Sequence, residues 1–99
     1  MTAMLIRLQV TDFAAWLPAF ASERAIRRAH GAEQERIFRN ASDPSDVFVL
    51  LAWDDVERAR LYAEADDVRV AAWQALVTAP PDIWLLQEPA AHDIPEFGT

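Results

Sequence analysis

The segment Val47–Trp53 is apolar on both faces of the strand that it predicts. Successive side chains of a strand point to opposite faces of its sheet. One face of this strand would carry Val47, Val49, Leu51 and Trp53, and the other would carry Phe48, Leu50 and Ala52. Residues 83–88 show the same pattern, with Ile83 and Leu85 opposite Trp84 and Leu86. A strand with one face in water alternates between apolar and polar residues, so both faces of this sheet must be covered.

Strand and helix signals follow one another in the order β-α-β-β-α-β. The predicted strands cover residues 3–10, 33–39, 47–53 and 83–88, and a long loop of turn-forming residues, 40–46, joins the middle two. This order predicts the ferredoxin-like fold of the α+β class, a four-stranded antiparallel sheet with two helices on one face. We expect this domain to span residues 1–88, with residues 89–99 as a C-terminal extension.

Capping residues and helix breakers set the expected helix limits. Thr11-Asp12 caps the first helix, and Pro18 predicts a short first turn, a kink and then a regular helix over residues 17–29. Gly31 is expected to be its left-handed cap. Asp54-Asp55 caps a second helix over residues 56–64, and a further helical segment is expected over residues 68–77.

Two helices cover only one face of such a sheet. A second copy of the chain, related by a two-fold axis, would cover the other face and give a homodimer. The alternative is that the 89–99 extension folds back over the open face of a monomer.

The charge and the residue content exclude several classes of function. The net charge of −7 disfavours nucleic acid as a partner. The chain has no cysteine and no lysine, which excludes thiolate and Schiff-base chemistry, and two glycines cannot form a phosphate-binding loop. The chain has no pair of histidines at helical spacing, so the sequence predicts no metal site. We expect no membrane span, no cofactor and a cytoplasmic location.

Several segments resemble the dimeric α/β-barrel proteins grouped with antibiotic-biosynthesis monooxygenases. They are Val10-Thr11-Asp12-Phe13 with Trp16, Arg36-Ile37-Phe38-Arg39, Asp43-Pro44, Val47–Trp53 and Asp54-Asp55. The resemblance implies a ferredoxin-like domain that pairs sheet to sheet as a dimeric α/β barrel. In that superfamily the fold serves cofactor-independent oxygenases of polycyclic phenols, haem-degrading enzymes and polyketide cyclases. The haem-degrading enzymes carry a histidine on the second helix, and this chain has none there.

Aromatic residues are the expected lining of a ligand pocket, because the resemblance places the pocket between the sheet and the helices. The candidates are Trp16, Phe20, Trp53, Tyr62 and Trp73. The alternative is that each of them belongs to the hydrophobic core, since aromatic residues at helical spacing usually do.

Polar candidates for chemistry are few. Arg24 and Arg27 continue the apolar stripe of Phe20 and are suited to hold an anionic or enolate oxygen. The alternative is that they complement the helix dipole and extend into solvent. His30 is a candidate for proton transfer, and Tyr62 for a hydrogen bond to a substrate hydroxyl.

Two functions remain open on this basis. One is a cofactor-independent monooxygenase or a cyclase of secondary metabolism that binds a hydrophobic aromatic small molecule. The other is a non-catalytic dimeric module that binds a ligand or a protein.

Overall fold

The computed structural model describes residues 1–65 and 76–89. The elements are β1 (Thr2–Gln9), α1 (Phe13–Ser22), α2 (Arg24–Ala29), β2 (Ala32–Asn40), β3 (Asp43–Trp53), α3 (Val56–Glu64) and β4 (Asp82–Gln87). Most of the helical segment expected over residues 68–77, with Trp73, lies outside the described residues, as does nearly all of the 89–99 extension. Val77, at the end of that expected segment, is described and forms an isolated β-bridge with Val10.

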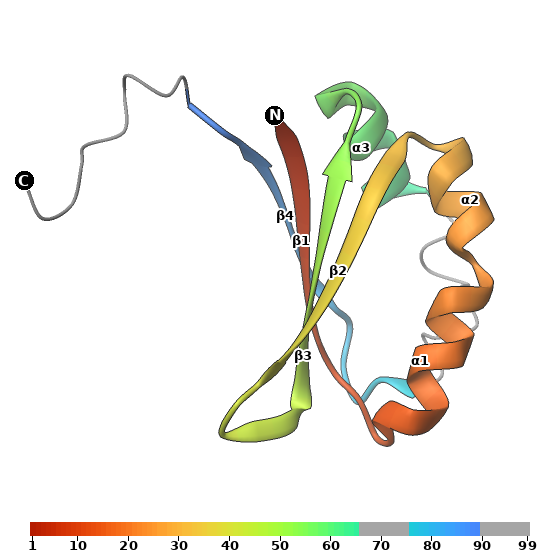
Figure 1. Cartoon of the computed structure of the whole chain (residues 1–99), viewed down its shortest axis with the longest axis vertical. Coiled ribbons are helices and arrows are strands. Elements are labelled where there is room, and N and C mark those ends of the chain that lie inside the picture. Colours follow the sequence, from red (N-terminus) through yellow and green to blue (C-terminus); the bar gives the residue numbers. More distant parts are fainter. Residues whose placement is uncertain (66–75, 90–99) are drawn as a thin grey trace, which may run out of the picture.

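The four strands form one antiparallel sheet in the order β2-β3-β1-β4. The helices lie along one side of this sheet (Figure 1). This is the predicted ferredoxin-like α+β fold, in which the first strand is central and pairs with the third and fourth. Ile6 of β1, for example, lies between Val49 of β3 and Ile83 of β4.

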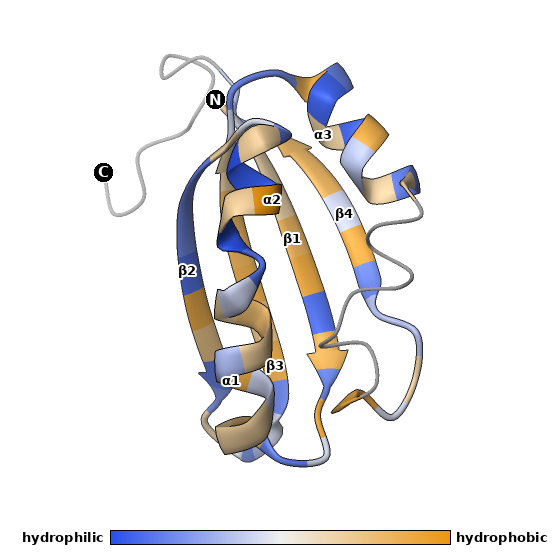
Figure 2. Ribbon diagram, turned by 90° about the vertical axis from the view of Figure 1, so that its right-hand side faces the viewer, coloured by the Kyte–Doolittle hydropathy of each residue, from blue (hydrophilic) through white to orange (hydrophobic). Residues whose placement is uncertain are grey.

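The hydrophobic core lies between the helices and the inner face of the sheet. Figure 2 shows that the central strands behind α1 and α2 are largely hydrophobic. The inner faces of the two central strands are fully buried. They contribute Met4, Ile6 and Leu8 from β1 and Val47, Val49, Leu51 and Trp53 from β3. α1 adds Trp16 and Phe20, and α3 adds Ala59 and Tyr62.

The prediction of a kink at Pro18 is wrong, because α1 runs through Pro18 and the helix breaks at Glu23 instead. Pro18 removes the bond to the carbonyl of Ala14, and both residues are exposed, so water can solvate that carbonyl. At the break, the Ser22 hydroxyl donates to the carbonyl of Ala19, the acceptor that a continuing helix would offer Glu23. The Glu23 N–H bonds the carbonyl of Phe20 instead.

The prediction of a long loop over residues 40–46 is also wrong. β2 extends to Asn40 and β3 begins at Asp43, which leaves a two-residue turn. Side-chain acceptors stabilise this tight connection, because Asn40 Oδ1 accepts from Ser42 N and Asp43 Oδ1 accepts from Ser45 N. A register shift between Arg39 and Asn40 absorbs the extra residues of β3.

The predicted caps are confirmed. Asp12 and Asp55 accept hydrogen bonds from Ala14 N and Glu57 N at the starts of α1 and α3. Gly31 follows α2 with φ of 114°, a conformation that favours glycine. The space is also closed to a side chain there, since an added Cβ would collide with Asp54 Oδ1.

The outer face of the sheet carries apolar side chains that no described helix covers. Phe38 and Trp84 are each 44% exposed and Leu86 is 43% exposed, while Leu5, Phe48 and Leu50 are half-buried. We call these six residues the outer apolar patch. Arg7 and Asp46 lie on the same face and form an ion pair with Nε 3.0 Å from Oδ1. The expectation that both faces of the strands are apolar therefore holds for the described residues.

Candidate functional site

A row of stacked aromatic rings runs along the inner side of α1. The ring centroids of Phe13 and Trp16 are 5.7 Å apart, and those of Trp16 and Phe20 are 4.9 Å apart. The i, i+3 and i, i+4 spacings bring these side chains onto one face of the helix. Trp16 is completely buried, yet its indole Nε1 has no hydrogen-bond partner among the described residues. A buried donor without a partner costs about 1–3 kcal/mol, so such groups are rare outside functional sites.

Arg27 of α2 is buried against the end of this aromatic row. Its side chain is completely buried, and its guanidinium carbon lies 3.7 Å from the centroid of the Phe20 ring. The Nε group donates to Glu35 Oε1 on the inner face of β2. Within the described structure, Nη1 and Nη2 are buried without a hydrogen-bond partner. Among the described residues, Arg27 therefore keeps its Nη donors and its positive charge toward the interior, on the side where it interacts with the Tyr62 hydroxyl.

Glu35 bonds two arginines at once. Its Oε2 accepts from Arg24 Nε at 3.0 Å while its Oε1 accepts from Arg27. Burial raises the pKa of Glu35, but the hydrogen bonds and charges of Arg27 and Arg24 outweigh this and hold the pKa below its ordinary value. The carboxylate is thus ionised and is shared between one buried cation and one exposed cation.

A second aromatic cluster joins α3 to the ends of α2 and β3. The ring of Tyr62 lies 5.2 Å from that of Trp53 and 5.2 Å from that of His30. Trp53 Nε1 donates to the His30 carbonyl at 3.0 Å, so this indole has a structural partner. Burial raises the pKa of Tyr62 to about 12, and the charge of Arg27 together with its hydrogen bonding to the Tyr62 hydroxyl acts in the opposite direction. Tyr62 is therefore a neutral hydroxyl at neutral pH, and Arg27 lies near both clusters.

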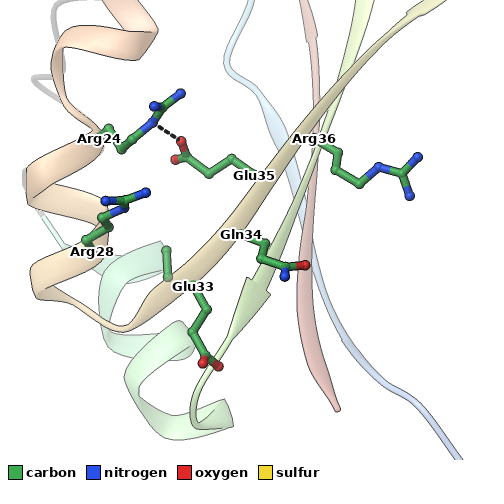
Figure 3. Close-up of a pocket in the computed structure, with 7 residues that line it drawn as sticks. Arg24, Arg28, Glu33, Gln34, Glu35 and Arg36 are labelled. Atoms are coloured by element: carbon green, nitrogen blue, oxygen red, sulfur yellow. Dashed lines mark hydrogen bonds and ion pairs between the residues drawn. The ribbon is translucent and has the colours of Figure 1, made fainter.

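A cleft of about 380 Å³ lies outside the core, between α2 and β2 (Figure 3). It is lined by Arg24, Arg28, Ala32, Glu33, Gln34, Glu35 and Arg36. The Arg24–Glu35 pair forms part of its wall, and the same carboxylate reaches Arg27 behind it. Glu35 therefore separates this surface cleft from the interior.

The structure sorts the residues predicted for the site into three groups. Trp16, Phe20 and Arg27 come together on the inner side of α1 and α2, and Trp53, Tyr62 and His30 form the neighbouring cluster. Arg24 lies at the surface with a side chain that is 55% exposed. Trp73 is outside the described residues.

Sequence reasoning missed Glu35. The signal was available, since Glu35 and Ile37 lie on the same inner face of β2, where an acidic residue needs a buried cation. Within residues 1–65 and 76–89 no group of three or more His, Asp or Glu residues is placed to hold a metal ion. None of the described helices is long and apolar enough to cross a membrane.

Solved structures share this arrangement of strands and helices. A Bordetella bronchiseptica protein, provisionally described as an antibiotic biosynthesis monooxygenase, superposes with a TM-score of 0.71 and 18% identity over 89% of this chain and 96% of its own. SnoaB of Streptomyces nogalater, a cofactor-independent oxygenase, superposes with a TM-score of 0.66 and 16% identity over 91% of this chain and 96% of its own. The fold is that of antibiotic-biosynthesis-monooxygenase-like proteins.

The same fold also occurs in a solved structure of unknown function. A Nitrosomonas europaea protein of unknown function superposes with a TM-score of 0.68 and 22% identity, over 91% of this chain and 90% of its own. No protein-family model and no curated protein matches the chain significantly. At these identities the likeness concerns the fold alone, and the chemistry depends on the side chains of this chain.

Proposed function

We propose that this chain is a homodimeric protein that binds a hydrophobic aromatic small molecule between its sheet and its helices, and oxygenates it without a cofactor. The observation that carries the proposal is the buried Trp16, whose ring stacks on Phe20 while its Nε1 finds no hydrogen-bond partner in residues 1–65 and 76–89. A flat molecule with a polar oxygen would stack on such rings and accept that hydrogen bond. The SnoaB fold, which this chain shares, is that of a cofactor-independent oxygenase.

Few catalytic groups are needed for this reaction. The ionised substrate carbon reacts with dioxygen, a peroxide forms, and loss of water leaves a carbonyl, so that CH₂ and O₂ become C=O and H₂O. The protein has to exclude water, orient the ring and stabilise the negative oxygen. In this proposal His30 accepts the proton from carbon, and Tyr62, neutral because of its raised pKa, donates a hydrogen bond. Arg24 is less suited to a role inside, because it is exposed and paired with Glu35.

The outer apolar patch supports the homodimer. Monomeric proteins rarely expose an apolar patch much larger than a few hundred Å². Burial of roughly 400 Å² at 25 cal/mol per Å² would contribute about 10 kcal/mol before the costs of association. A two-fold axis would place the patch of one copy on the same patch of the other, and the Arg7–Asp46 pair would lie in the same interface.

Oxygen uptake with an anthrone tests the catalytic part of the proposal. We expect one O₂ to be consumed per anthrone oxidised, and a loss of at least about tenfold in kcat for His30→Ala and Tyr62→Phe. Leu61→Ala, at a side chain that is 65% exposed, should retain the wild-type rate.

A different result would identify a binding module. If the folded protein binds anthrones and hydroquinones in equilibrium measurements but consumes no O₂ with any of them, the enzymatic function is wrong. The aromatic site would then remain, and the protein would be a non-catalytic ligand-binding dimer.

A further inference from the structure

We propose that the interior site takes its aromatic ligand as an anion, with a carboxylate, phenolate or enolate oxygen held by Nη1 and Nη2 of Arg27. The proposal rests on the proposed function, because it specifies the ligand of the same site. It assigns the recognition of charge to Arg27, and the positioning of Arg27 to Glu35 and Phe20.

The first observation is an incomplete balance of charge. Glu35 is the acidic partner of both Arg24 and Arg27, and its carboxylate is divided between them. A guanidinium group is a cation with five N–H donors and no acceptor, so Arg27 brings a positive charge into the interior. A completely buried cation that shares its only described carboxylate partner is a site where an anion is favoured.

The second observation is the orientation of the guanidinium. Glu35 takes the Nε group and the Phe20 ring lies against the guanidinium at 3.7 Å, so two contacts fix the plane of the group. No described residue meets ordinary hydrogen-bond distance and angle to Nη1 or Nη2, although the Tyr62 hydroxyl interacts with this guanidinium. Two N–H groups in a fixed fork match a carboxylate, or a single oxyanion that accepts from both.

The third observation is that an aromatic surface lies beside these donors. Phe20 touches Arg27 and also stacks on Trp16, whose Nε1 is another buried donor without a described partner. One ring system could therefore stack in the aromatic row while its charged oxygen reaches Arg27. A neutral ligand at the same position would stack on the rings but would make no charge interaction with Arg27.

A matched pair of probes tests the proposal on the full chain. 2-Naphthoate and 2-naphthamide have the same ring system and a similar shape, and only the first is an anion at neutral pH. We expect the wild type to bind 2-naphthoate at least about tenfold more tightly than 2-naphthamide in calorimetric titrations. Arg27→Met should reduce this preference to about onefold while changing the affinity for 2-naphthamide by less than about twofold. Arg28→Met, an exposed residue of the same helix, should keep the wild-type preference.

The outcomes separate this proposal from the proposed function. If the wild type binds both probes equally, the ligand is not recognised as an anion, while the aromatic site stands. If neither probe binds, both proposals fail. A preference that survives in Arg27→Met also overturns the assignment. If Arg27→Met does not fold, Arg27→Lys replaces it, because lysine keeps the positive charge but lacks the two-pronged guanidinium. Its preference for 2-naphthoate over 2-naphthamide should lie between about onefold and the wild-type value. The comparison of the two probes on the wild type tests the recognition of an anion without any variant.

Discussion

The guanidinium of Arg27 in α2 packs on the ring of Phe20 in α1, with its central carbon 3.7 Å from the ring centroid. This contact joins two helices that the break at Glu23 separates, and it keeps a cation at the aromatic end of the core. A cation over a desolvated aromatic face contributes about 2 kcal/mol. The contact therefore stabilises the fold, and it also orients the guanidinium of the candidate site.

A double-mutant cycle would measure this contact. Phe20→Leu should destabilise the protein by about 1–2 kcal/mol, because the ring stacks on Trp16 as well as on Arg27. Combined with Arg27→Met, it should show a coupling energy above about 0.5 kcal/mol in urea unfolding. Additive effects of the two substitutions would show that the contact contributes nothing to stability.

Glu35 predicts a dependence of stability on acid pH. Its pKa in the folded protein is below the ordinary value of about 4.3, so its ionised form stabilises the fold fully above that value. The contribution is lost as the pH falls through the lowered pKa. Glu35→Gln should cost about 1.5–3 kcal/mol at pH 7, since it weakens hydrogen bonds between charged groups, and much less at low pH.

Urea unfolding at pH 7 and at pH 3 measures this difference. Glu33→Gln, at an exposed residue of the same strand, is the matched control and should show a small effect at both values. An equal cost of Glu35→Gln at both pH values would contradict the assigned ionisation.

Tyr62 is the only tyrosine of the chain, which makes its titration directly observable. Ultraviolet difference spectra should show a pKa of about 12 in the folded protein and about 10 in urea. Burial disfavours the ionised form, so the associated stability is complete below about pH 10 and declines as the pH rises toward 12. Tyr62→Phe should lack this part of the alkaline decline, and a folded-state pKa near 10 would be the contrary result.

Gly31 is expected to tolerate no side chain. Gly31→Ala should destabilise the protein by about 1–3 kcal/mol, because φ is 114° and the new Cβ would collide with Asp54 and Trp53. Ala29→Gly, at the exposed end of α2, should cost less than about 1 kcal/mol. Thermal unfolding of the two variants compares the costs, and a smaller loss for Gly31→Ala than for Ala29→Gly would refute the assignment.

Leu50→Glu tests the proposed dimer. The residue lies within the outer apolar patch on β3, so two buried carboxylates would face each other across a two-fold axis. Sedimentation should show a dimer for the wild type at micromolar concentration and a monomer for the variant. Glu57→Gln, at an exposed residue of α3, should remain dimeric. A wild-type monomer would remove the proposed interface.

The strand pattern and the capping residues predict most of this fold. Val47–Trp53 determines a central strand with two apolar faces, and Asp12, Asp55 and Gly31 mark helix limits by local hydrogen bonding and backbone geometry. The break at Glu23 was not predictable in this way. The break depends on the hydrogen bond from the Ser22 hydroxyl to the carbonyl of Ala19. In the sequence, Pro18 is the stronger indication of a helix break.

The candidate site was predicted only in part. Helical spacing places Phe20 and Arg27 near one another, but it treats Arg24 as equivalent to Arg27. The break after Ser22 turns Arg24 toward solvent, and Arg27 is buried instead. Glu35 acquires its role from the packing of α2 on β2, a tertiary contact that periodicity along one strand cannot supply.

The composition of β2 has a consequence for how copies of the chain meet at high concentration. β2 is an outermost strand, and its exposed positions include Glu33, Gln34, Arg36 and Arg39. Charged side chains along a free edge discourage a neighbour from adding its own strand there, which is the route by which sheets grow into fibrils. Aggregation through β2 is therefore disfavoured, and contacts between folded molecules are left to surfaces other than this strand edge.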